Sequence, residues 1–194
     1  MPKHHHYIVF KPQGFLSQFI VNGKRKKKHK MLGELFDFAP NTMAIGRLDE
    51  DSEGLLLLTT DGKVSFEILS AKYEKEYWVQ VDGLVDNKAI EQLKKGVEIG
   101  INGKKYFTKP CKAKKITTPD LPARTKKIRD SRHGPTSWVS ITLREGKFRQ
   151  VRKMTAAVGF PTLRLIRIRI DTIYLNNMQP GDVLPVNTLF TNKD

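Results

Sequence analysis

One continuous apolar run, Leu55–Thr59, constrains the fold of this chain more than any other segment. It is far shorter than the roughly 20 residues that a membrane-spanning helix needs. Asp61-Gly62 follows it directly and is a strong turn signal. A short apolar run that ends at a turn predicts a buried strand. Immediately before it come four carboxylates in a chain of net charge +15: Asp49, Glu50, Asp51 and Glu53.

The composition favours a polyanionic partner. Lys and Arg number 35 against 20 Asp and Glu, which points first to nucleic acid and then to an anionic membrane surface. Apolar runs are too short for a spanning helix, and no early segment resembles a signal peptide, so no membrane association is expected. The single Cys111 excludes an internal disulfide. A soluble, cytoplasmic protein is expected.

The order of expected elements favours an α+β fold. Many short strands alternate with few helices and show no regular βαβ rhythm, which predicts a mixed sheet. The expected strands are His6–Lys11, Met43–Leu48, Leu55–Thr59, Lys75–Val81, Val97–Ile101, Lys105–Ile116, Thr136–Leu143, Leu163–Ile170 and Asp182–Val186, and the expected helices are Met31–Phe38, Lys63–Ser70, Asn87–Lys95 with Asp86 as its cap, and Phe148–Val158.

Basic residues gather in two expected loops and on one strand. Lys24–Lys30 repels itself and predicts a mobile loop, either solvated or in contact with phosphates. Thr117–Gly134, rich in proline and cations, predicts a long exposed loop that meets the polyanion. On the strand Leu163–Ile170, the isoleucines are expected to pack while Arg167 and Arg169 present their guanidinium groups on the other face.

The acidic run does not fit a metal site. Asp49, Asp51, Glu53 and Gly54 fall at positions one, three, five and six of an EF-hand loop, but the residue at the twelfth position is Thr60 in place of glutamate. Four leucines occupy the positions between, and a loop that wraps an ion cannot also be a buried strand. The adjacent histidines at residues 4–6 more simply form an exposed terminus. No metal is expected.

Two chemical interpretations of the acidic run remain open. It forms either a solvated or helix-capping turn, or a catalytic carboxylate that acts with arginine. No P-loop or dinucleotide fingerprint is present, and nothing places a nucleophile beside a base. In Glu145–Met154, Arg149, Arg152 and Lys153 share one face of the expected helix. That face is either a plain basic surface or a site that holds a phosphate or keeps a carboxylate ionised.

Four segments in order resemble the RsuA-type branch of the pseudouridine synthase family. Gly46–Gly62, GRLDEDSEGLLLLTTDG, resembles the catalytic motif of these enzymes. Lys11–Gly14 resembles the K-P-x-G strand end, and Lys75–Tyr77 resembles the K-x-Y motif. Gly146–Arg167 resembles the third motif and the strand that follows it. The resemblance runs over almost the whole chain.

The resemblance implies the pseudouridine synthase fold, a largely antiparallel mixed sheet with flanking helices and a central active-site cleft. It implies one catalytic domain over residues 1–194 with two lobes, the smaller made of about residues 1–45 and part of the C-terminal region. No S4 RNA-binding domain is expected.

The resemblance also implies the reaction. A uridine of ribosomal RNA is flipped out and isomerised to pseudouridine without a cofactor. Pro135–Trp138 and Val158–Arg167 resemble members that act on large-subunit 23S rRNA. The expected partner is therefore rRNA, and the expected state is a monomer. The alternative is a non-catalytic rRNA-binding or ribosome-assembly protein of the same fold.

Roles follow by position from the family motifs. Asp49 matches the catalytic aspartate, Tyr77 lies against the target base, and Arg152 pairs with Asp49 and keeps it ionised. Arg47 resembles the residue that fills the gap left in the RNA. The remaining expected RNA-binding residues are Lys75, Arg149, Gln150, Lys153 and Arg167.

Overall fold

The structure is a computed structural model that describes residues 4–20, 29–70, 73–124 and 126–190. It divides into two compact units, the first made of residues 1–73 and 167–194 and the second of residues 74–166. Each unit contains strands and helices, which confirms the α+β class. No helix among the described residues is long and apolar enough to cross a bilayer.

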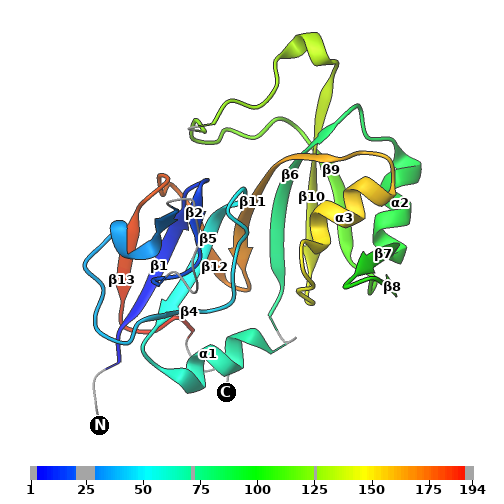
Figure 1. Ribbon diagram of the computed structural model, residues 1–194. Coiled ribbons are helices and arrows are strands. Elements are labelled where there is room, and N and C mark those ends of the chain that lie inside the picture. Colours follow the sequence, from blue (N-terminus) through cyan, green and yellow to red (C-terminus); the bar gives the residue numbers. More distant parts are fainter. Residues whose placement is uncertain (1–3, 21–28, 71–72, 125, 191–194) are drawn as a thin grey trace. The chain divides into compact units, whose positions relative to one another are not determined.

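The first unit is built on β1 (His6–Lys11), which pairs antiparallel with β5 (Glu53–Thr59) on one side and β13 (Val183–Val186) on the other (Figure 1). All seven residues of β5 are buried, as the apolar run predicted. Two-residue strands β4 (Met43–Ala44) and β12 (Ile173–Tyr174) pair with β5 and β11 (Thr162–Ile170). Helix α1 spans Gly62–Leu69, and a parallel pair joins β2 (Phe15–Leu16) to β3 (Lys30–Met31).

The expected helix over Met31–Phe38 is wrong. Only the 3-10 helix η1 (Leu32–Glu34) forms there. Phe36 and Phe38, two residues apart, both pack edge-on against the ring of Tyr7, with centroids 5.9 and 5.0 Å away. Residues two apart point to opposite sides of a helix, so a helix could not bring both rings to Tyr7, and this aromatic packing overrides helix propensity.

Two other expectations in the first unit change. The strand expected over Met43–Leu48 stops after β4, and Gly46 just beyond has a positive φ of 71°. That left-handed conformation turns the chain out of the sheet. Residues 24–28 of the basic run lie outside the described residues, and Lys30 begins β3.

The second unit is a sheet in which β10 (Thr136–Leu143) pairs antiparallel with both β6 (Lys75–Asp82) and β9 (Lys112–Ile116). Alternate residues of β6 are buried, as its period of two predicted. The boundary between the units falls within β11, between Ile166 and Arg167.

Helix α2 (Asn87–Lys95) of the second unit has the bounds that the sequence predicted. The Asp86 carboxylate accepts a hydrogen bond of 2.7 Å from the Ala89 N–H and caps it, as expected. Ile90 and Leu93 are buried, and α2 packs along β9.

A hairpin with a two-residue turn links β7 (Glu98–Ile101) and β8 (Lys104–Phe107). Asn102 and Gly103 both have positive φ, which is the turn geometry that their sequence predicted. The strand expected over Lys105–Ile116 is instead split into β8 and β9. Pro110 lies between them, and proline cannot donate to a strand ladder.

Candidate active site

The acidic run forms a turn that leads into β5 in the first unit. The Ser52 N–H donates to the Asp49 carbonyl at 3.0 Å and closes that turn. Asp49 is half-buried, and Arg47, two residues earlier, is exposed. Asp49 therefore stands on a closed turn just before a fully buried strand.

The main chain on either side of Asp49 is tied to the segment that follows β1. The Ser17 hydroxyl accepts from the Leu48 N–H at 2.9 Å and donates to the Leu48 carbonyl at 2.8 Å. The Gly14 N–H donates to the Glu50 carbonyl at 2.7 Å. Bonds on both sides of Asp49 fix its main chain, which would suit a group that must act in one geometry.

The conformation of the run does not suit calcium. Residues from Glu53 onward belong to β5, whereas an EF-hand would need them to curve around an ion. Among the residues that the structure describes, no three His, Cys, Asp or Glu side chains are grouped to hold a metal.

A buried lysine that the sequence did not single out lies under this turn. Lys11, at the end of β1 opposite Gly54, has no exposed surface. Its ammonium donates to the Pro12 carbonyl at 2.9 Å and to the Phe15 carbonyl at 2.6 Å. Burial lowers the pKa of Lys11 to about 7, and nearby negative charge opposes that shift, from Glu53, Asp51, Asp49 and Glu50. The K-P-x-G motif contains Lys11, but burial of its charge is visible only in the fold.

This lysine should make stability rise with pH. The unfolded chain keeps the ordinary lysine pKa near 10.5, so between about pH 7 and 10.5 it binds a proton that the folded chain has lost. The free energy of unfolding should therefore gain about 2 kcal/mol from Lys11 between pH 7 and pH 9. Urea unfolding of wild type and Lys11→Met at both pH values measures this gain, which the variant should lack.

In Lys11→Met two carbonyls lose their hydrogen-bond donor. This loss lowers the free energy of unfolding equally at both pH values, so it does not alter the change between pH 7 and pH 9. Lys63→Met, at an exposed position of α1, is the matched control and should keep the wild-type difference. If the free energy of unfolding depends on pH equally in wild type and Lys11→Met, the pKa of Lys11 is not lowered in the folded protein.

Lys75 and Tyr77 lie on β6 in the second unit. Tyr77 is 9% exposed and is opposite Ile141 of β10. The Lys75 ammonium donates to the Arg144 carbonyl at 3.5 Å, a long hydrogen bond. The two candidate side chains therefore project from a paired strand, which gives them a rigid base.

Helix α3 begins later than expected and spans Gln150–Ala157. Arg149 precedes it in the left-handed region, with φ of 51°. The prediction that Arg149 shares a helical face with Arg152 and Lys153 is therefore wrong. The Lys153 ammonium donates to the Gly100 carbonyl at 2.7 Å and lies over the Phe148 ring at 5.1 Å.

A hydrogen-bonded hub that the sequence did not reveal holds the start of α3. The Glu145 carboxylate accepts from the Tyr106 hydroxyl at 2.5 Å, the Lys109 N–H at 2.9 Å and the Gln150 side-chain amide at 2.5 Å. Gln150 is buried and in turn accepts from the Lys147 N–H at 2.9 Å. This hub fixes the turn at Arg149 and so the direction in which α3 leaves it.

Arg167 departs from its expected position. It is 4% exposed, and its Nε donates to the Leu55 carbonyl at 2.7 Å. Its backbone lies so close to Gly54 that no side chain fits there. The expectation that Arg167 presents its guanidinium outward is therefore wrong, since the guanidinium is turned back onto β5.

The candidate residues fall into two groups. The first unit contains Asp49, Arg47 and Arg167, and the second contains Lys75, Tyr77, Arg149, Gln150, Arg152 and Lys153. The first group comes from the turn before β5 and from β11, and the second from β6 and the start of α3. The pairing of Arg152 with Asp49 stays a prediction.

Comparison with known proteins gives the family. Residues 5–157, more than half of the chain, match the family model described as RNA pseudouridylate synthase. The chain belongs to the RNA pseudouridylate synthase family. The matched span includes the Asp49 turn, β6 and α3 and contains all the candidate residues except Arg167.

Relatives within the RNA pseudouridylate synthase family are similar over most of their length. Ribosomal large subunit pseudouridine synthase E of Vibrio parahaemolyticus is 43% identical over 179 residues, which cover 90% of this chain and 71% of that protein. The protein of the same name from Xanthomonas campestris is 40% identical and is covered to 91%, against 90% of this chain. A solved structure, "Crystal structure of pseudouridylate synthase", superposes with a TM-score of 0.72 at 28% identity, over 96% of this chain and 71% of that one. The family and fold predicted from the motifs are confirmed.

Proposed function

We propose that this chain isomerises a uridine of large-subunit rRNA to pseudouridine. The observation that carries the proposal is identity of 40–43% over nine-tenths of the chain to proteins named ribosomal large subunit pseudouridine synthase E. The net charge of +15 supports a polyanionic substrate.

The reaction rearranges one nucleotide without an external reagent. The bond between N1 of uracil and the sugar breaks, the base rotates, and C5 bonds to the sugar carbon. The proton that leaves C5 is balanced by the proton that N1 gains, so no redox step or cofactor is required. A uracil in folded RNA must first be flipped out, at about a few kcal/mol.

We assign the chemistry to Asp49. Its half-buried carboxylate stands on a turn whose main chain is bonded on both sides, which suits a group that must meet the flipped nucleotide in one geometry. Arg152 is assigned to pair with Asp49 and keep it ionised. Tyr77 is assigned to lie against the base, where aromatic stacking contributes about 1–3 kcal/mol.

The other candidates divide by exposure. Exposed Arg47 is assigned to fill the space that the flipped base leaves, and the half-buried Lys75, Arg149 and Lys153 are assigned to contact RNA. Gln150 and Arg167 are buried, so we assign them positioning roles, Gln150 at the start of α3 and Arg167 against β5.

The setting follows from the proposed substrate. The partner is rRNA or a pre-ribosomal particle, and we propose that the protein works as a monomer in the cytoplasm, where ribosomes are assembled.

Mapping of pseudouridines in rRNA from a strain that lacks the gene tests the proposal. Carbodiimide treatment and primer extension should show one large-subunit pseudouridine lost, and a plasmid copy should restore it. An unchanged large-subunit map would overturn the proposal, and a position lost from small-subunit rRNA would correct the substrate while keeping the chemistry.

A further inference from the structure

A long loop of the second unit, residues 117–135, leaves the sheet at the end of β9 and returns at the start of β10 (Figure 1). Among its described residues, the only regular element is the 3-10 helix η2 (Ser131–His133). Loops of this length inside compact units are uncommon and are usually functional or disordered. This one is tied down, which argues for function.

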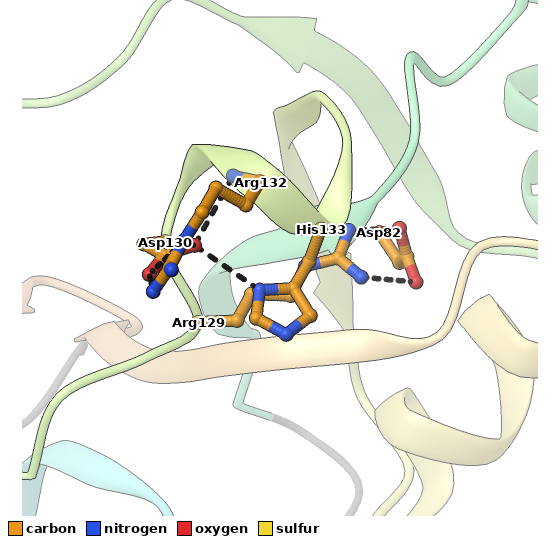
Figure 2. A network of polar contacts seen from close by, with 5 residues as sticks. All are labelled: Asp82, Arg129, Asp130, Arg132 and His133. Carbon is orange, nitrogen blue, oxygen red and sulfur yellow. Dashed lines mark hydrogen bonds and ion pairs between the residues drawn. The ribbon is translucent and has the colours of Figure 1, made fainter.

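Two arginines anchor the loop. Arg129 donates from both terminal nitrogens to the carboxylate of Asp82 at the end of β6, with Nη1 2.9 Å from Oδ2 (Figure 2). Arg164 of β11 donates to the Pro122 carbonyl at 2.9 Å. Two-pronged arginine–carboxylate pairs fix orientation as well as distance. We call this segment, residues 117–135, the latched loop, and the pair Asp82–Arg129 its latch.

The carboxylate end of the latch is itself rigid. The Asp82 N–H donates to the Pro161 carbonyl and the Gly83 N–H to the Pro135 carbonyl, both at 2.9 Å. The Ser137 hydroxyl donates to the Gly83 carbonyl at 2.8 Å and accepts from the Val85 N–H at 2.9 Å. The latch therefore joins the loop to a turn that is also hydrogen-bonded to Pro161, just before β11, and to Ser137 of β10.

Beyond the latch, the loop tip is held by its own contacts. The Asp130 carboxylate accepts from Arg132 at 2.6 Å and lies 3.2 Å from the His133 ring (Figure 2). The side chains of Arg129, Asp130 and Arg132 are thus occupied within the protein.

Two cations of the loop are left for a partner. Lys126 and Lys127 are exposed, and neither forms an ion pair with another described residue. Lys114 and Lys115 on β9, which leads into the loop, are exposed as well. The loop therefore offers positive charge at Lys127, two residues before Arg129, which the latch holds.

We propose that the latched loop binds the phosphate backbone of the substrate RNA through Lys126 and Lys127, with Asp82 and Arg129 as positioning residues. This inference rests on the proposed function, because that supplies RNA as the polyanion. A loop ordered in advance loses less conformational entropy on binding, so the latch raises affinity without touching RNA.

Salt dependence of binding tests the contact. In the double variant Lys126→Gln/Lys127→Gln, the slope of log K against log salt for a large-subunit rRNA fragment should fall in magnitude by about 1.4–1.8. Lys94→Gln/Lys95→Gln, which removes the same charge at the end of α2, is the control and should keep the wild-type slope. An unchanged slope in the loop variant would overturn the contact.

Asp82→Asn tests the latch, because the direction in which the Kd for RNA changes separates two explanations. Removal of a negative charge should tighten RNA binding if only charge matters, whereas a broken latch should raise Kd about three- to tenfold. The Asp82 side chain is 41% exposed, so asparagine there remains solvated, and thermal melting checks that the fold is kept. Tighter or unchanged binding would overturn the latch. Both tests measure binding alone, so a protein that binds rRNA without isomerising it would refute the proposed function and leave this inference standing.

Discussion

Asp49→Asn should abolish isomerisation, by at least about 10³-fold, and leave rRNA affinity near that of wild type. Asparagine has the size of aspartate but carries no charge, so it can act neither as a nucleophile nor as a base. The main chain around residue 49 is held by Ser17 and by the turn to Ser52, and these bonds do not involve the Asp49 carboxylate. Turnover of an rRNA transcript under saturating enzyme measures the effect.

Asp51→Asn is the matched control for this prediction. It removes the same charge two residues away in the same turn, and it should turn over at close to the wild-type rate. If Asp49→Asn keeps wild-type turnover, or if both variants lose it equally, the assignment of the chemistry to Asp49 is wrong.

Gly54→Ala should give the largest loss of stability, about 3–5 kcal/mol of the free energy of unfolding. A Cβ at this position would lie 2.3 Å from the Arg167 carbonyl oxygen and 2.8 Å from its nitrogen. These are backbone atoms of β11, which cannot move aside as a flexible side chain would. Gly54 also has a φ of 105°, a conformation in which alanine is strained. Urea unfolding measures the loss.

Gly62→Ala is the control for the glycine prediction. It makes the same chemical change at the start of α1, where an added Cβ meets no atom within 4 Å, so stability should stay the same or rise slightly. A Gly54→Ala protein as stable as wild type would mean that β5 and β11 do not approach as closely as described.

Elements with strong local patterns were predictable from the sequence. β1 and β10 have their expected bounds, and β5 is a buried strand as its run of leucines indicated. α2 was recognisable because its cap, Asp86, and its buried Ile90 and Leu93 all agree. In these segments tertiary contacts reinforce what the local sequence already prefers.

Other elements depended on contacts that no local pattern encodes. Phe36 and Phe38 lie outside a helix because Tyr7 packs against both rings. Arg149 is left-handed where the sequence predicted helix, and the Glu145 hub holds the turn beside it. Arg167 turns inward to the Leu55 carbonyl, although strict alternation predicted an outward guanidinium.

For the candidate site, the motifs point to Asp49, Tyr77 and Arg152, because those residues stand in recognisable strings. The roles of these three residues stay predictions. Lys11 and Glu145 stand in the same strings, but their importance lies in burial and shared hydrogen bonds, which only the fold reveals.

Formation of pseudouridine in large-subunit rRNA by the purified protein is the decisive test of the proposed function. Unmodified large-subunit rRNA is incubated with the full chain, treated with carbodiimide and read by primer extension. We expect one new pseudouridine with wild type and none with Asp49→Asn. A wild-type protein that binds this RNA and forms no pseudouridine at any position would contradict the proposed function, and would leave a non-catalytic rRNA-binding protein of the same fold.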